Sequence, residues 1–492
     1  MQEDTNLPYF HGALMDQDAD NLLQNEGDFL IQSRHTSTAV RQRLVIAIRT
    51  KDAIKRIDLR RGDSGIRLGG KTFPSLKKLV EHYSKEPIVL QGGEELLLKK
   101  AVPKGKYQLV HSDVRLLKKI GSGAYGTVYR GQLIRDNNRV IAVKRIDSEG
   151  TDDQALAEMM KEARVMQLND HKHIVRFFGF IVDRMPYLLV MEYCDGGSVE
   201  DKLRAHPKKI SIPRRIDMST QGSYGLEYLH SRDCIHRDIA TRNCLIDKGI
   251  VKLADFGMCR ATTVYKIDLS KPLNVRWLAP EVWRNGETRY NTDIYAYGVL
   301  LWEMFEIPYN SPYAEWKAYT VKQKVMAGYR MPPPPAMPEE MVVIMELAWN
   351  HDPEKRPDAA NLRKLLEEVN KKYGSAEEEK QKSALSQNAQ HPRQYPAKMF
   401  ACQFAFFLFL ELNQVRICVY VLLQHVKRAR LHAHVGGDPL VIRYCNSLYK
   451  DTNPSQRHQV LVIAASVLYR KMMRIIVIVP EHPRNFSTVL FV

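Results

Sequence analysis

The sequence predicts an α+β protein with two globular domains and a tail, and three observations lead to this prediction. The chain has 492 residues, which is more than one ordinary hydrophobic core supports. Its composition of 44% hydrophobic and 26% charged residues is typical of globular proteins. Strand patterns and helix patterns are mixed in two separate segments. We therefore expect a first domain over residues 7–90, a linker over 91–113, a second domain over 114–370 and a tail over 371–492.

The totals argue against several kinds of partner and site. The net charge is +17, and residues 374–492 alone hold 15 Lys and Arg against 7 Asp and Glu. The sequence contains no basic stripe interleaved with aromatic residues, so it does not predict a nucleic-acid partner. Seven cysteines without a CxxC pair argue against a disulfide framework or a zinc site. The polar N-terminus with Gln2 predicts neither a signal peptide nor N-myristoylation.

The first domain is expected to hold a sheet between two helices. Apolar periodicity predicts a short helix over residues 19–23 and a second helix over 73–83. Residues 27–34, 43–49 and 54–59 are predicted strands, because they are rich in apolar residues or alternate apolar with charged ones. Together with the segment Phe10-His11-Gly12, this order resembles a Src-homology 2 (SH2) domain, a family that binds phosphotyrosine peptides.

The predicted phosphotyrosine pocket departs from that family. In that family, an arginine on a strand of the sheet makes a bidentate contact to phosphate. In this chain Gln32 stands at its position, followed by Ser33. A neutral amide lacks both the charge and the fork geometry of arginine. Asp16 stands where a second family arginine is common, and its carboxylate would repel phosphate. Arg34 and Arg56 are nearby cations that could compensate, so we expect phosphotyrosine binding to be weak or lost, with a purely structural module as the alternative.

A glycine-rich segment opens the second domain. Gly121, Gly123 and Gly126 have the spacing G-x-G-x-x-G, followed by Val128. Glycines let backbone amides approach a phosphate group without a Cβ clash. Dinucleotide-binding folds use the same spacing, but strand-type residues on both sides of this segment favour a β-hairpin. The sequence therefore predicts a nucleotide-phosphate site that includes Gly121, Ser122, Gly123, Gly126 and Val128.

Two further segments carry phosphoryl-transfer chemistry. Asp238 and Asn243 lie five positions apart, and Asp255 follows twelve residues later. Phosphoryl transfer needs an acceptor for the substrate hydroxyl proton and oxygen ligands for Mg²⁺. Lys144 ends an apolar strand and needs a carboxylate partner, for which the following helix offers Glu158 and Glu162.

These motifs, in this order, resemble those of protein kinases over residues 114–370. The resemblance implies a bilobal protein-kinase fold, with a β-rich N-terminal lobe and a helical C-terminal lobe, and ATP and Mg²⁺ as cofactors. It implies that Lys144 contacts the ATP phosphates with Glu162 as its partner, that Asp238 is the catalytic acceptor, and that Asn243 and Asp255 hold Mg²⁺.

The adenine site and the phosphorylation site follow from the same resemblance. Residues 187–194 resemble the strand and hinge that hold adenine, which implicates Met191, Glu192 and Cys194; a plain core strand is the alternative. Arg237 is expected to pair with a phosphate on the activation segment. Tyr265 is the candidate residue there, and an unmodified exposed tyrosine is the alternative.

The acceptor is predicted to be tyrosine. Serine/threonine kinases usually have Lys where Ala240 stands, whereas Arg242 resembles the catalytic-loop arginine of tyrosine kinases. Residues 275–281 also resemble the tyrosine-kinase segment that supports the substrate, although Asn274 replaces the usual Pro. With an N-terminal SH2-like domain, the chain most resembles the Fes/Fer subgroup of non-receptor tyrosine kinases. We expect a cytoplasmic short form acting on protein substrates, with peripheral membrane association left open.

Two other functions stay open at this point. A pseudokinase or adaptor scaffold that binds signalling partners would explain the altered Gln32 pocket and Tyr295, which replaces a usual Trp. A membrane-anchored kinase would need the apolar residues 404–423 to span a bilayer, yet Arg416 near their centre would cost about 2.5–3.5 kcal/mol. The tail is expected to be disordered or irregular with apolar stretches, as a lineage-specific extension or as translated non-coding sequence.

Overall fold

The computed structural model describes residues 6–34, 43–62, 64–123, 126–146, 152–270 and 272–390. The chain divides into two compact units, residues 1–383 and 384–492, and every described element except the end of the last helix lies in the first unit. Mixed helices and strands confirm the predicted α+β class. None of the helices in the described ranges is long and apolar enough to cross a membrane.

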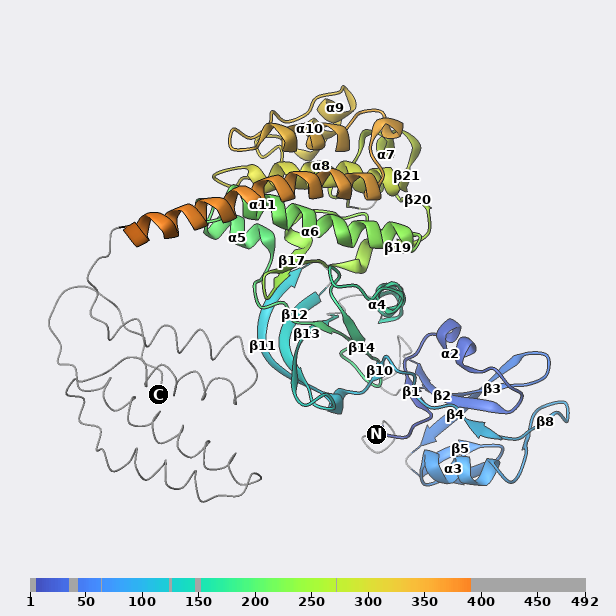
Figure 1. Ribbon diagram of the computed structural model, residues 1–492. Helices are drawn as coiled ribbons and strands as arrows, with labels where there is room; N and C mark the ends of the chain where they lie inside the picture. The colour runs from blue at the N-terminus through green and yellow to red at the C-terminus, as the bar shows by residue number, and fades with distance from the viewer. Residues whose placement is uncertain are drawn as a thin grey trace, which may run out of the picture. The chain divides into compact units, whose positions relative to one another are not determined.

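A twisted sheet forms the first domain, with one helix on each face (Figure 1). Its strands, in spatial order, are β1 (Phe10–Gly12), β2 (Asp28–Arg34), β3 (Arg43–Arg49), β4 (Ile54–Gly62), β5 (Gly65–Leu68) and β6 (Lys71–Phe73). Because side chains alternate along a strand, Phe29 and Ile31 share a core with α3 (Leu76–Tyr83), while Leu30 joins the core that includes Ala19 of α2 (Asp16–Leu22).

The predicted linker contributes strands to both domains. After the hairpin of β7 (Ile88–Val89) and β8 (Glu95–Leu96), strand β9 (Lys100–Ala101) pairs with β2 of the first sheet. Strand β10 (Gln108–Leu109) then pairs with β14 (Phe177–Ile181) of the second sheet. Residues 91–113 are therefore hydrogen-bonded to both sheets instead of forming a free connection.

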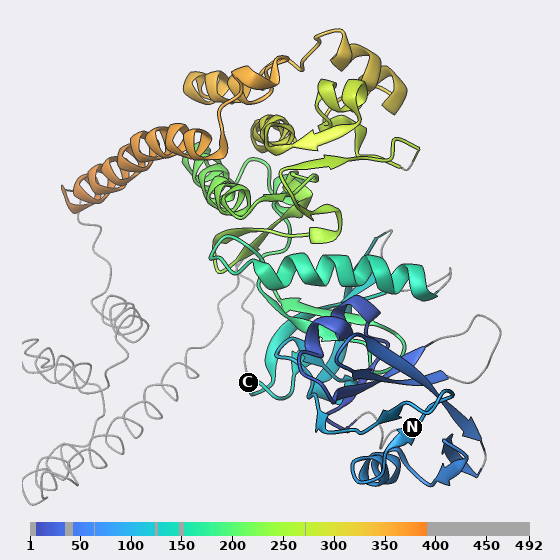
Figure 2. The same cartoon turned by 90° about the vertical axis from the view of Figure 1, so that its right-hand side faces the viewer.

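The strand-rich part of the second domain is a six-stranded sheet in the order β10-β14-β15-β13-β12-β11, against which helix α4 packs (Figure 2). The remaining bounds are β11 (Val114–Gly123), β12 (Gly126–Leu133), β13 (Arg139–Arg145), β15 (Leu188–Glu192) and α4 (Asp152–Leu168). Its own core includes Val143, Ile181 and Val190. This sheet positions the glycine-rich segment and Lys144.

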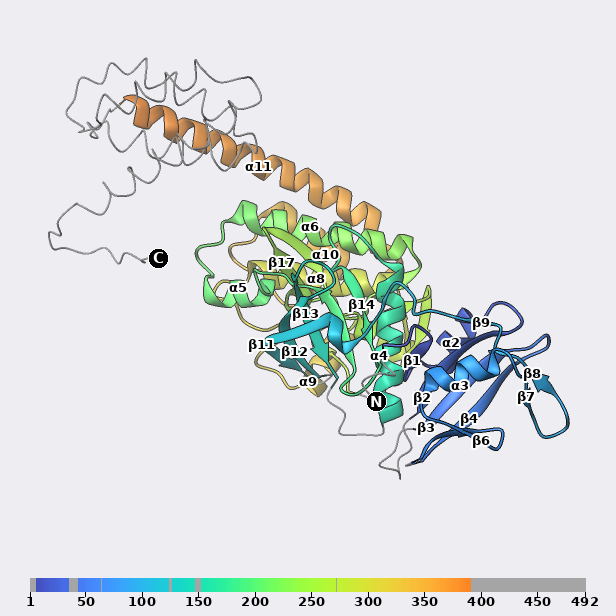
Figure 3. The same ribbon diagram turned by 90° about the horizontal axis from the view of Figure 1, so that it is seen from below.

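Helices dominate the rest of the second domain (Figures 1 and 3). They are α5 (Val199–Ala205), α6 (Ile212–Ser231), α7 (Pro280–Asn285), α8 (Tyr290–Phe305), α9 (Ala318–Met326), α10 (Glu339–Ala348) and α11 (Ala359–Gln390). Helix α8 lies at the centre, and all its residues from Thr292 to Phe305 are buried. An internal ion pair joins α7 to the end of the 3₁₀ turn η5 (Pro353–Lys355): Arg356 Nη1 lies 2.6 Å from Glu281 Oε1.

Short ladders and 3₁₀ turns connect the larger elements of the chain. The ladders pair β16 (Cys234–Ile235) with β19 (Arg260–Ala261), β17 (Cys244–Asp247) with β18 (Ile250–Leu253), and β20 (Val264–Lys266) with β21 (Glu287–Arg289). The 3₁₀ turns are η1 (His111–Asp113), η2 (Thr241–Asn243), η3 (Phe256–Met258), η4 (Val275–Trp277) and η5 (Pro353–Lys355).

Several predicted boundaries differ from the structure. The second helix of the first domain begins at Leu76, because Phe73 belongs to β6 and Ser75 caps the helix by accepting from the Lys78 amide. The irregular structure expected after residue 370 was wrong for residues 371–390, which continue α11. That segment is rich in Ala, Glu, Lys and Gln, which are strong helix formers. The apolar stretch 404–423 lies outside the described residues.

Candidate active site

The glycine-rich segment forms the hairpin between β11 and β12, in which Gly121 pairs with Val128 and Ser122 with Thr127. Gly126 has φ +128°, and a Cβ there would lie 2.1 Å from the Arg145 carbonyl oxygen. The fold itself therefore requires glycine at that position. A Cβ on Gly121 would meet no described atom within 4 Å, so protein packing does not explain that glycine.

Lys144 and Glu162 form a buried ion pair across the interface of β13 and α4. The Lys144 Nζ lies 2.7 Å from Glu162 Oε2 and 3.0 Å from Oε1, and the two side chains are 12% and 7% exposed. Burial raises the pKa of Glu162, while the charge of Lys144 opposes that rise. Glu158, one turn earlier, instead pairs with Lys161 on the exposed side of α4. Of the two candidate carboxylates, the structure brings only Glu162 to Lys144.

Asp255 completes this group. Its Oδ1 lies 4.0 Å from Lys144 Nζ, and its backbone has φ +61°, a left-handed conformation that turns the chain before the buried Phe256. The neighbouring Ala254 amide donates to the Asn243 carbonyl oxygen at 2.8 Å. This bond joins the Lys144 group to the loop that carries Asp238.

The Asp238 carboxylate is buried and accepts hydrogen bonds from three side chains. Asn243 Nδ2 donates to Oδ2 at 2.6 Å and to the Asp238 carbonyl oxygen at 2.8 Å. Arg242 Nη2 donates to Oδ1, and Asn274 Nδ2 donates to the same oxygen at 2.7 Å. These hydrogen bonds hold the Asp238 carboxylate in one orientation.

Two buried carboxylates of α8, which sequence reasoning missed as supports, hold the loop from behind. Asp293 accepts from the backbone amides of His236 and Arg237, each at 2.7 Å. Glu303 accepts from Thr241 Oγ1 at 2.7 Å and from Trp277 Nε1 at 3.0 Å. A single Glu within the apolar run from Val299 to Phe305 was the available signal, because a lone buried carboxylate needs donors.

A contact between the side chains of Arg242 and Trp277 links the Asp238 loop to η4. The Arg242 guanidinium carbon lies 4.1 Å from the centre of the Trp277 ring, a cation–π contact. Ala240 is fully buried, so no side chain there reaches outward. Arg242 is thus held between the Asp238 carboxylate and an aromatic face.

The residues present fit a magnesium–nucleotide site better than a resident metal centre. Among the described residues, no group of three or more His, Cys, Asp or Glu is arranged to hold a metal ion. Asn243 and Asp255 offer an amide oxygen and a 43% exposed carboxylate. Hard oxygen ligands in such small number suit Mg²⁺, which keeps waters and phosphate oxygens as its other ligands.

The predicted adenine strand ends beside a structural ion pair. Met191 and Glu192 are half-buried in β15, and Glu192 Oε2 lies 3.1 Å from Lys252 Nζ. The Glu192 carboxylate is therefore already engaged, by Lys252 and by the Arg176 amide. Cys194 is buried, which raises the pKa of its thiol to about 12 and keeps it neutral.

Tyr265 lies on β20 between two arginines. The Arg237 and Arg260 guanidinium carbons lie 4.3 and 5.0 Å from the centre of its ring. Burial would raise the pKa of Tyr265, but the hydrogen bond and charge of Arg260 and the charge of Arg237 lower it overall. Arg237 Nε is buried without a hydrogen-bond partner among the described residues.

In the first domain, the carboxylate of Asp16 occupies the predicted phosphate pocket. Gln32 is buried in β2, and its Nε2 donates to Asp16 Oδ1 at 3.2 Å and to the Leu14 carbonyl oxygen at 2.7 Å. Arg34 Nη2 donates to both Asp16 oxygens at 2.8 Å. Arg56 Nε lies 3.2 Å from Asp16 Oδ1.

The other candidate members of this pocket do not change that arrangement. Arg56 also pairs with Asp20, and the buried Ser33 hydroxyl has no hydrogen-bond partner among the described residues. Sequence reasoning treated Asp16 as a repulsive group. The structure adds that Asp16 pairs with Arg34 and Arg56, the two arginines that could have compensated for the missing one.

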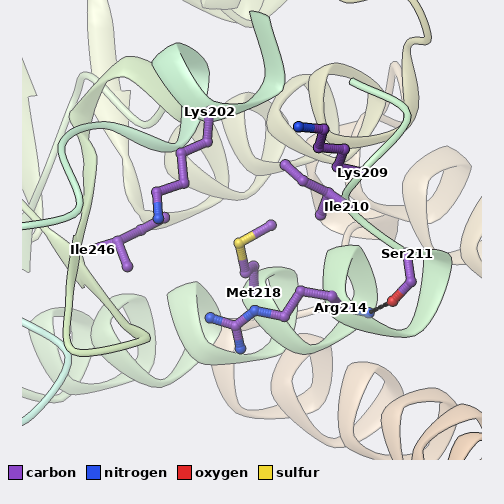
Figure 4. A pocket seen from close by; sticks show the side chains of 7 residues that line it. All are labelled: Lys202, Lys209, Ile210, Ser211, Arg214, Met218 and Ile246. Carbon is purple, nitrogen blue, oxygen red and sulfur yellow. Dashed lines mark hydrogen bonds between the residues drawn. The ribbon is translucent and has the colours of Figure 1, made fainter. Parts of the chain in front are cut away.

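A separate basic hollow lies on the helical part of the second domain (Figure 4). Its volume is about 310 Å³, and it lies between α5, the start of α6 and β17. The residues that line it are Lys202, Lys209, Ile210, Ser211, Arg214, Met218 and Ile246. None of the predicted site residues is among them.

Comparisons with known proteins identify a family for each of the two domains. A family model described as protein tyrosine and serine/threonine kinase matches residues 114–366, and an SH2 domain model matches residues 9–83. Over 371 residues the chain is 33% identical to the tyrosine-protein kinase transforming protein Fps of Avian sarcoma virus (strain PRCII), covering 74% of this chain and 68% of the viral protein.

Two further relatives are similar over nearly the same share of the chain. Tyrosine-protein kinase Fer of Homo sapiens is 31% identical over 368 residues, covering 74% of this chain and 44% of Fer. Fer-related kinase 1 of Caenorhabditis elegans is 30% identical over 372 residues, covering 73% of this chain and 93% of the nematode protein. The matched region thus spans less than half of human Fer. The predicted likeness to an SH2 domain and to Fes/Fer-type kinases is confirmed.

Proposed function

Because this chain belongs to the protein tyrosine and serine/threonine kinase family and is a protein-tyrosine kinase, we propose that it uses ATP and Mg²⁺ to phosphorylate tyrosine residues of protein substrates. One observation carries the proposal. The Lys144–Glu162 pair, Asp255 and the Asp238 carboxylate form one connected group, joined by the 4.0 Å approach of Lys144 to Asp255 and by the bond from Ala254 to Asn243.

Each residue has a role that suits its environment. The Lys144 ammonium, held by Glu162, would bind the α- and β-phosphates of ATP. Asp238 would accept the proton of the tyrosyl hydroxyl while the tyrosyl oxygen attacks the γ-phosphorus, and Arg242 keeps the carboxylate oriented. Gly121, Ser122, Gly123, Gly126 and Val128 would cover the phosphates. The backbone near Met191, Glu192 and Cys194 would hold adenine.

The metal is proposed from ligand chemistry alone. Asn243 and Asp255 would hold Mg²⁺, which, when bound, neutralises phosphate charge. The chain's own contribution is to keep these two oxygen ligands close to Lys144 and Asp238. Tyrosine as the acceptor is supported by the stack of Arg242 on Trp277 and by the small buried Ala240.

Regulation and location are part of the same proposal. Tyr265 would be the activation-segment phosphosite, because its phosphate would lie beside Arg237 and Arg260. The SH2 domain would bind phosphotyrosine peptides weakly or not at all, because Asp16 engages Arg34 and Arg56. A cytoplasmic location is supported by the free thiols of Cys194, Cys234, Cys244 and Cys259.

Transfer of ³²P from ATP to a poly(Glu,Tyr) polymer tests the proposal. Asp238→Asn should lower transfer by about 10²–10⁴-fold, the usual contribution of a proton acceptor. Glu162→Gln should lower it strongly, whereas Glu158→Gln, on the exposed side of the same helix, should leave it within about twofold. Undiminished transfer by Asp238→Asn would overturn the catalytic assignment. A parent protein that binds partners but transfers no phosphate would favour the scaffold alternative.

A further inference from the structure

Asn274 makes a contact that the proposed function has not used. It precedes η4, and its Nδ2 donates to Asp238 Oδ1 at 2.7 Å across 36 positions of sequence. The kinase pattern has Pro at this position, and proline has no side-chain donor. This chain therefore places an additional donor on the catalytic carboxylate.

The hydrogen bonds on Asp238 can be assigned oxygen by oxygen. A carboxylate offers about four lone-pair positions, two on each oxygen. Arg242 and Asn274 both donate to Oδ1, so that oxygen is fully occupied. Oδ2 accepts from Asn243 only among the described side chains, which leaves one position open. The oxygen available to a substrate hydroxyl is therefore Oδ2.

Two of the three donors, Arg242 and Asn274, link Asp238 to the segment that follows Asn274, and only Asn274 does so by a hydrogen bond from the segment's own start. Arg242 also stacks on Trp277, and Asn243 also holds the Asp238 carbonyl oxygen. Asn274 is exposed and leads directly into Val275–Trp277, where Trp277 is fixed by Glu303. A bond from Asn274 thus couples the position of this segment to the rotation of the carboxylate.

We propose that Asn274 is a positioning residue for phosphoryl transfer, which holds Oδ1 of Asp238 so that Oδ2 accepts the tyrosyl proton. The role rests on the proposed kinase function. In that step the tyrosyl O–H bond breaks and its proton goes to Oδ2. The tyrosyl oxygen forms the new bond to the γ-phosphorus, and the bond from that phosphorus to the bridging oxygen breaks, with ADP leaving.

Substitutions at Asn274 make a clean test because its side chain is not packed in a hydrophobic core. Asn274 is exposed, and its φ of −79° is compatible with proline. Asn274→Ala and Asn274→Pro in the full chain should lower kcat for a tyrosine peptide about tenfold, the effect expected on losing one hydrogen bond to a charged group. KM for ATP should stay within about twofold, because the nucleotide groups are untouched.

Two controls separate positioning from a structural role. Asn274→Gln keeps an amide donor on a longer side chain and should recover kcat to within about threefold of the parent. Pro272→Ala changes an exposed residue of the same segment and should leave kcat unchanged. A kcat loss in Asn274→Ala that Asn274→Gln does not recover, or that comes with an equal rise in KM for ATP, would overturn the inference.

The result also distinguishes this inference from the function on which it rests. An active parent whose kcat is unchanged by Asn274→Ala would overturn the positioning role and leave the kinase assignment intact. A parent without phosphate transfer would overturn both.

Discussion

Asp18 in α2 and Arg164 in α4 form a two-pronged ion pair, although 146 positions of sequence separate them. Arg164 Nε lies 2.9 Å from Asp18 Oδ1, and Nη2 lies 3.3 Å from Oδ2. Arg164 is two positions after Glu162, the partner of Lys144. Ala19 and Leu23 of the first domain also belong to the same hydrophobic cluster as Met159 and Ala163 of α4. The SH2 domain is therefore in contact with α4, the helix that carries the ion-pair partner of Lys144.

Arg164→Ala should lower kcat/KM for a tyrosine peptide about two- to fivefold. The pair is partly buried, with side chains 33% and 16% exposed, so its loss should cost about 1 kcal/mol and loosen the placement of α4. Steady-state kinetics measure this effect. Lys161→Ala, which removes an exposed pair on the same helix, is the matched control. In a double-mutant cycle, Asp18→Asn should add little to Arg164→Ala, and full additivity would contradict the coupling.

The parent SH2 domain should bind a phosphotyrosine peptide only weakly, and the double substitution Asp16→Ala with Gln32→Arg should raise its affinity at least about tenfold. The substitutions remove the internal carboxylate and supply a bidentate phosphate donor, while Arg34 and Arg56 become available. Calorimetric titration of the full chain measures the affinity. Gln24→Arg, at an exposed position outside this pocket, controls for added charge. Tight binding by the parent, or no gain in the double variant, would contradict the prediction.

Arg356→Ala should destabilise the second domain by about 3–5 kcal/mol. Removing one partner leaves the Glu281 carboxylate without its counter-charge, and the Arg356 side chain is fully buried. Urea denaturation, followed by tryptophan fluorescence, measures the change. Arg289→Ala breaks the exposed pair with Glu287 and should cost no more than about 1 kcal/mol. Equal costs for the two substitutions would contradict the role of burial.

Stability should fall as the pH drops below about 6.5, and His11 should account for part of the slope. Burial lowers the pKa of His11, whose ring nitrogens lie 2.8 Å from Gln108 Oε1 and 3.0 Å from the Val102 carbonyl oxygen. Between the ordinary pKa and the lowered one, the unfolded chain binds a proton that the folded chain does not, so acidification favours unfolding. The contribution of one histidine is at most about 1.4 kcal/mol per pH unit.

The melting temperature between pH 7.0 and pH 5.5 measures that slope. His11→Gln should flatten it, whereas His206→Gln, at an exposed position, should not. An unchanged slope in His11→Gln would show that other groups, such as the buried His173, carry the acid sensitivity.

Much of the fold was predictable because strand and helix patterns are local. The bounds of β3 and the starts of β4 and of the glycine-rich hairpin follow from alternation and from glycine spacing within a few residues. The linker and the end of α11 were less predictable. Strands β9 and β10 have two residues each, and they exist only because neighbouring strands offer them hydrogen-bond partners.

The sequence by itself determined the chemistry of this protein. Lys144, Asp238, Asn243 and Asp255 are recognisable because of their residue types, their order in the chain and the short spacings from Asp238 to Asn243 and Asp255, which match what phosphoryl transfer requires. Only the tertiary structure decided which distant groups meet them: Asp16 against Arg34, Asp18 against Arg164, Glu303 behind Thr241, and Asn274 on Asp238. The physical reason is that hydrogen bonds and ion pairs form only at distances of about 3 Å. Those distances are set by how the elements pack and cannot be read from sequence spacing.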